Sequence, residues 1–137
     1  MVRRHVPVAI ALVLLATPAL ARSPVPIVDF KDQAIVMVGG KTPTDAQVRD
    51  AIIRASAALG WSLAPDGDGK FIATLVVRNK HTVVAEVTYS PEKYSVVYKS
   101  SINMKYDVKN GVPVVHPFYN DWAKKLVDAI RAEISKY

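Results

Sequence analysis

The sequence has no cysteine, and this absence excludes several kinds of chemistry. Disulfide bonds, thiolate metal sites and thiol nucleophiles all require cysteine, and so does a lipid anchor attached behind a signal peptide. Stability must therefore come from apolar packing, which a chain with 50% hydrophobic residues permits.

Histidine and clustered metal ligands are also scarce. The chain has three histidines, and one of them, His5, lies in the N-terminal segment. No Gly-x-Ser-x-Gly motif surrounds Ser100 or Ser101, so the sequence shows no nucleophile elbow. The turn that holds Asp66 and Asp68 lacks the further oxygen ligands and the distal glutamate of a calcium loop. We expect no metal and no cofactor.

No basic run or aromatic stacking motif indicates a nucleic-acid binder. The formal net charge of +6 becomes +4 when the two N-terminal arginines are removed. A modest positive excess favours an anionic component of the cell envelope as partner, and it equally serves solubility alone.

The one long apolar run lies at the N-terminus and predicts a secretory signal peptide over residues 1–21. Arg3 and Arg4 precede apolar residues 8–16, and residues 19–21 form the small-residue cleavage site. The run is too short to cross a bilayer, so no membrane span remains after cleavage behind Ala21. We expect a bacterial periplasmic or secreted protein, with an N-terminal arm over residues 22–33 and a single domain over residues 34–137.

The centre of the chain predicts an antiparallel meander. Residues 70–78, 82–89 and 94–106 alternate apolar and polar side chains with a period of two, which is typical of strands with one buried face. The breaks between them are short enough for hairpin turns. The first break contains His81, which we therefore expect to be a solvated turn residue.

Two helices and two shorter strands complete the predicted fold. Helices are expected over residues 44–59, where Thr44 and Gln47 have capping-box spacing, and over residues 117–135, where Pro117 suits the first helical position. Strands are expected over residues 34–38 and 61–64, and residues 107–113 are expected to form a loop around Asn-Gly. The order β-α-β-β-β-β-α predicts an α+β two-layer sandwich, with a four- to five-stranded antiparallel sheet and two helices on one face.

The candidate binding residues lie where the third long strand ends and where the last helix begins. The short loop between them should bring the two groups together. The set is Ser101, Asn103, His116, Tyr119, Asn120 and Trp122. His116 is the residue with the most chemistry, as a ligand donor or as an acid or base. The sequence favours a structural role, in which His116 caps the helix or bridges it to the sheet, because no carboxylate or nucleophile is tied to it by spacing. We expect the ring of Trp122 to be buried against the sheet.

Several of these segments resemble one protein family. They are Gly60-Trp61, the strand end Tyr98-Lys99-Ser100-Ser101-Ile102-Asn103, and the run His116-x-x-Tyr119-Asn120-x-Trp122. Together they resemble a family of small exported bacterial proteins, many described as lipoproteins, to which no activity is assigned. The resemblance spans roughly residues 46–134 and implies a similar fold and compartment. Two departures are Ser100, where the family has an acidic residue, and the missing lipidation cysteine.

Three functions remain open on the sequence. The first is a non-enzymatic envelope domain that binds a ligand or a protein through the six candidate residues. The second is a small hydrolase or acid–base enzyme that uses His116 with Ser101, Asn103 or Tyr119 nearby. The third is a structural protein that oligomerises through an exposed sheet edge. The sequence fixes neither the ligand nor the oligomeric state.

Overall fold

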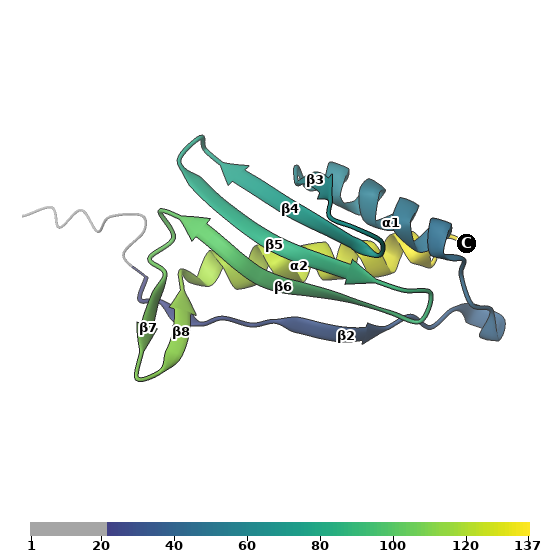
Figure 1. Cartoon of the computed structure of the whole chain (residues 1–137), viewed down its shortest axis with the longest axis horizontal. Coiled ribbons are helices and arrows are strands. Elements are labelled where there is room, and N and C mark those ends of the chain that lie inside the picture. The colour runs from purple at the N-terminus through teal and green to yellow at the C-terminus, as the bar shows by residue number, and fades with distance from the viewer. Residues whose placement is uncertain (1–21) are drawn as a thin grey trace, which may run out of the picture.

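The computed structural model describes residues 22–137, which form two α-helices and two antiparallel sheets (Figure 1). The α+β fold expected from the sequence is confirmed. The elements in chain order are β1 (Val25–Pro26), β2 (Phe30–Ala34), the 3-10 turn η1 (Val38–Gly40), α1 (Asp45–Ala58), β3 (Ser62–Pro65), β4 (Lys70–Val77), β5 (His81–Tyr89), β6 (Lys93–Ile102), β7 (Asp107–Lys109), β8 (Val112–Val115) and α2 (Pro117–Ile134). The predicted signal peptide, residues 1–21, lies outside the described residues.

The main sheet has five strands in the order β2-β6-β5-β4-β3, and its centre is the predicted meander. The register pairs Phe71 with Val87 and Val87 with Val96, so the alternating apolar side chains of three strands share one face. That face is buried, because alternate residues of β4 and β5 lie in the core. The predicted hairpin between β3 and β4 is confirmed as well.

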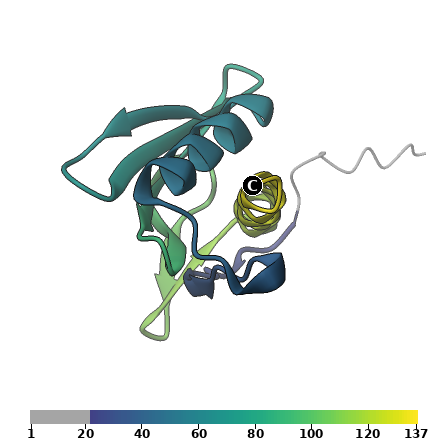
Figure 2. The same cartoon turned by 90° about the vertical axis from the view of Figure 1, so that its right-hand side faces the viewer.

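Both helices pack on this buried face, and Figure 2 shows α2 end-on beside the sheet with α1 next to it. The capping box predicted for α1 is present, with Gln47 N donating to the Thr44 hydroxyl over 3.1 Å and Thr44 N donating to the Gln47 side chain over 3.0 Å. Gly60 follows α1 with a φ of 81°, which favours glycine at this position. Within residues 22–137, no helix is long and apolar enough to cross a membrane.

The first edge strand differs from the sequence prediction. A strand was expected over residues 34–38, whereas β2 runs from Phe30 to Ala34 and pairs with β6. Asp32 has a φ of 52° and its backbone N–H donates to Ser95 Oγ over 2.8 Å, which interrupts the ladder at an irregular register. Strand β2 contains Lys31, Asp32 and Gln33, whereas residues 35–38 are all apolar, so hydrophobicity pointed to the wrong part of the segment. The predicted arm, residues 22–33, therefore contributes strands to both sheets.

The expected loop over residues 107–113 is instead part of a hairpin of strands β7 and β8. Strand β8 also pairs with β1, which gives a small sheet in the order β1-β8-β7. Asn110 and Gly111 have φ values of 52° and 76°, the positive pair that a tight two-residue hairpin turn needs. Strand β6 also ends earlier than predicted, at Ile102 rather than Tyr106. Asn103 and Lys105 follow with positive φ, and these residues turn the chain toward the small sheet.

Candidate functional site

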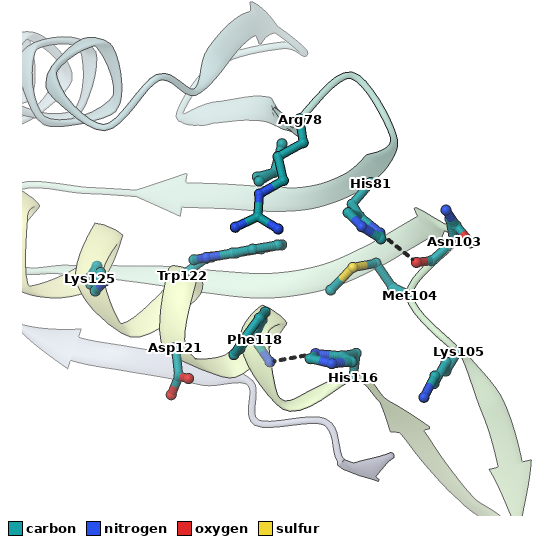
Figure 3. Close-up of a pocket in the computed structure, with 11 residues that line it drawn as sticks. Arg78, His81, Asn103, Met104, Lys105, His116, Phe118, Asp121, Trp122 and Lys125 are labelled. Atoms are coloured by element: carbon teal, nitrogen blue, oxygen red, sulfur yellow. Dashed lines mark hydrogen bonds between the residues drawn. The ribbon is translucent and has the colours of Figure 1, made fainter. Parts of the chain in front are cut away.

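A cavity of about 390 Å³ lies at one end of the main sheet, where four chain segments converge (Figure 3). These segments are the end of β4, the start of β5, the chain just after β6, and the first turns of α2. Its volume is within the range of roughly 300–1,000 Å³ that is usual for small-molecule pockets. The lining residues are Val77, Arg78, His81, Asn103, Met104, Lys105, His116, Phe118, Asp121, Trp122 and Lys125.

His116 occupies the N-cap position of α2 and is only 2% exposed. Its Nδ1 accepts a hydrogen bond from the Phe118 backbone N–H over 3.1 Å, so this nitrogen carries no proton and Nε2 carries it. The Nε2 atom is fully buried and has no hydrogen-bond partner within residues 22–137. His116 therefore lines the cavity and also has a buried N–H donor without an acceptor in the described part of the chain.

The surroundings of His116 keep its ring neutral. Burial is the largest cause and lowers its pKa, and the positive charges of Lys105 and Arg22 and the proximity of His81 lower it further. The carboxylate of Asp121 acts in the opposite direction. The geometry and the pKa direction agree, because a neutral ring with its proton on Nε2 can accept at Nδ1 and donate at Nε2.

His81 is not the solvated turn residue that we expected. It is the first residue of β5 and is 6% exposed, and its Nδ1 lies 2.8 Å from the carbonyl oxygen of Asn103. Because side chains alternate along a strand, His81 belongs to the same face as Val83 and Ala85, which points it into the core layer. Extending the apolar alternation of β5 back by two residues would have predicted this position.

The walls of the cavity are aromatic and apolar. The rings of His116 and Phe118 have centroids 4.5 Å apart, and the Phe118 and Trp122 rings lie 5.9 Å apart with their planes tilted by 44°. Met104 is buried and also lines the cavity, and Val77 contributes the apolar side chain of β4 to the lining.

The rim carries more positive than negative charge. Its charged residues are Arg78, Lys105 and Lys125 against one carboxylate, Asp121. Among the ion pairs within residues 22–137, none includes Arg78 or Lys125. Figure 3 shows the Arg78 side chain reaching from the β4–β5 turn toward Trp122.

The structure brings three of the six predicted site residues to the cavity: Asn103, His116 and Trp122. Asn103 forms its edge, where its side-chain amide donates to the Lys80 carbonyl over 3.2 Å. Trp122 is only partly buried: it packs against the core and also lines the cavity, so the expectation of a ring buried against the sheet holds only in part.

The other three predicted residues have structural contacts. Ser101 Oγ lies 2.7 Å from the hydroxyl of Tyr98. Tyr119 is fully buried, with its ring edge-on to Tyr98 and its hydroxyl unpaired, and burial raises its pKa. Asn120 accepts from Val28 N over 2.9 Å and donates to the Pro26 carbonyl over 3.0 Å, which fastens the N-terminal strands to α2.

The sequence did not point to most of the cavity lining, including Arg78, Met104, Lys105 and Lys125. Surface cations have no characteristic spacing, so only the fold shows that Arg78, Lys105 and Lys125 share a rim. Lys125 is eight residues from Pro117 and could have been found by extending the candidate segment along the helix.

Comparisons with protein-family models, with curated proteins and with solved structures found no significant match to this chain. The geometry of the cavity is therefore the guide to the function of this protein. Among residues 22–137, no group of three or more potential ligands is arranged to hold a metal ion.

Proposed function

We propose that this protein is a non-enzymatic domain that binds a small molecule in the cavity between the main sheet and the start of α2. The observation that carries the proposal is the cavity of about 390 Å³, whose lining includes His116, a residue with a buried Nε2–H that has no acceptor within residues 22–137. An unpaired buried donor costs about 1–3 kcal/mol unless another molecule, such as a ligand or a water, supplies the acceptor. An acceptor atom on a bound molecule would remove this cost.

We further propose that the domain works in the bacterial cell envelope after export. The support is the pattern of residues 1–21: two arginines, an apolar run and a small-residue cleavage site. Mass spectrometry of the protein from a periplasmic fraction should give a chain that starts at Arg22. Recovery of the uncleaved chain from the inner membrane would contradict this part of the proposal.

Binding is favoured over hydrolysis by the composition of the cavity wall. Within residues 22–137, the lining contains no serine, threonine or tyrosine, so no hydroxyl nucleophile of these residues faces His116 there. Ser101, the partner that a serine hydrolase would need, is hydrogen-bonded to Tyr98. The Nδ1 atom of His116 is occupied by the backbone of α2, which fits a fixed donor better than a group that must both accept and release a proton.

A structural, oligomerising role is the second candidate. It is favoured by two exposed apolar side chains, Val76 on β4 with 53% exposure and Ile102 on β6 with 67% exposure. Both residues pair with Thr82 of β5, which lies between them in the sheet. Sedimentation velocity at low and high concentration tests it, because self-association would raise the sedimentation coefficient with concentration.

The binding proposal is tested with the tryptophan fluorescence of the mature chain. The chain has two tryptophans, Trp122 in the cavity wall and Trp61 in the core, so the Trp61→Phe variant makes Trp122 the only reporter. A small-molecule fraction from the envelope should change its emission. The same addition should have no effect when His116→Asn is also present, because asparagine preserves the helix cap but removes the imidazole donor. Emission that is unchanged in both proteins would contradict ligand binding at this site.

A further inference from the structure

We infer that the molecule bound in this cavity is an organic anion with a flat aromatic body, an inference that rests on the proposed binding function. The rim supplies the positive charge, and the wall supplies the surface for an aromatic ring. The rim cations predict the anionic group of the ligand, and the aromatic wall residues predict its flat body.

The anionic part follows from the charges around the mouth of the cavity. Three cationic side chains and one carboxylate among the lining residues leave an excess of two positive charges from the lysine, arginine and aspartate side chains. Arg78 and Lys125 have no ion-pair partner within the described chain, so a ligand anion would not have to displace an internal carboxylate from either. A guanidinium group also matches a carboxylate in shape, because it can donate two parallel hydrogen bonds.

The donor of His116 fits the same anion or a carbonyl next to it. Its Nε2–H is held in one direction, because Nδ1 is fixed by the Phe118 backbone. A fixed neutral donor stabilises an acceptor oxygen and offers nothing to a ligand ammonium group, which needs acceptors. The histidine therefore adds to the preference for an acceptor-rich ligand over a cationic one.

The aromatic part follows from the wall. Phe118 and Trp122 form two tilted faces, and buried Met104 adds a polarisable sulfur close to them. Aromatic rings pair with such faces by stacked or edge-on contacts that contribute beyond the buried area, and a thioether adds favourable contact at a ring edge. A flexible acyl chain would bury apolar surface but would make no ring–ring contacts, and it would lose more conformational freedom on binding.

The inference is tested by calorimetric titration of the mature chain, purified from the periplasm, with four probes. The probes are 2-naphthoate, its neutral amide 2-naphthamide, the cation 2-naphthylmethylammonium, and the aliphatic anion decanoate. We expect 2-naphthoate to bind about tenfold more tightly than each of the other three, since a charge-assisted hydrogen bond contributes enough for that ratio.

Variants assign the effect to the rim. Arg78→Gln and Lys125→Gln should each weaken 2-naphthoate several-fold and leave 2-naphthamide unchanged. Lys41→Gln is the matched control, because Lys41 is an exposed lysine that follows η1 and lies outside the cavity lining. The Lys41 variant should bind like the unmodified protein.

The outcomes separate this inference from the proposed function. Preference for the amide, the cation or decanoate would overturn the ligand class, yet it would leave a cavity that binds small molecules. Failure of all four probes would overturn the ligand class too. The proposed function would fall with it only if the envelope fraction also left the Trp122 emission unchanged.

Discussion

The Nδ1 atom of His81 lies 2.8 Å from the carbonyl oxygen of Asn103, and this contact joins the start of β5 to the segment that leaves β6. Asn103 is at the edge of the cavity and has a φ of 61°, so its carbonyl is held where the chain changes direction. The contact therefore helps to set the shape of the cavity floor, although His81 was expected in solvent.

The first prediction concerns this contact. His81→Ala removes the donor and empties space beside the core, so the free energy of unfolding should fall by about 1–3 kcal/mol. Urea denaturation measures the change. A matched control is Lys80→Ala in the same turn, where only the exposed side chain is lost and the backbone carbonyl that accepts from Asn103 remains. Equal stability of the two variants would contradict a structural role for His81.

The second prediction concerns the pH dependence of stability. Burial, Lys105, Arg22 and His81 lower the pKa of His116 below its ordinary value of 6.5, while Asp121 opposes them. The unfolded chain therefore takes up a proton at a higher pH than the folded chain does. The contribution of neutral His116 to the free energy of unfolding should be fully present above the unfolded pKa. This contribution should be lost as the pH falls through 6.5 and below.

Thermal melts at about pH 7.5 and about pH 5.5 measure this effect. The melting temperature should fall more between about pH 7.5 and about pH 5.5 for the unmodified protein than for His116→Asn. The asparagine keeps an N-cap acceptor but cannot titrate in this range. His81 is present in both proteins, so the difference isolates His116. Equal losses would show that His116 has no shifted pKa.

The third prediction compares the two tryptophans. Trp61 is 5% exposed in the core, so Trp61→Ala should lower the free energy of unfolding by about 3–5 kcal/mol. Trp122 is partly buried and has the cavity on one side, so Trp122→Ala should cost less than about 2 kcal/mol and should weaken ligand binding. Denaturant melts give the two values. The reverse order would show that Trp122 belongs to the core, as first expected from the sequence.

The sequence predicted those parts of the fold that repeat a local pattern. The alternation in β4 and β5, the Thr44–Gln47 capping box and Pro117 at the start of α2 each determine their own segment, and each was confirmed. The first strand was misplaced because the apolar residues 35–38 look more like a strand than β2 itself, which contains Lys31, Asp32 and Gln33. The Asn110–Gly111 turn was identified, but the partner of its hairpin is β1, which lies in a proline-containing segment that shows no strand pattern.

The candidate site could be predicted only in part for a similar reason. His116 and Trp122 stand out in the sequence by residue type, and Asn103 by its place at the end of a strand. The rim cations and Met104 come from three separated segments, and only the folded chain brings them together. Ser101, Tyr119 and Asn120 have the right residue types for a site but direct their polar atoms to other partners or into the core.

The most direct test of the binding site is native mass spectrometry of the protein, purified gently from the cells that make it. We expect the unmodified protein to carry an additional small-molecule mass that disappears on denaturation, and the His116→Asn variant to lack it while showing the same far-UV circular dichroism. A ligand-free unmodified protein, or the same bound mass in both proteins, would contradict the account of His116 as the donor that holds the ligand.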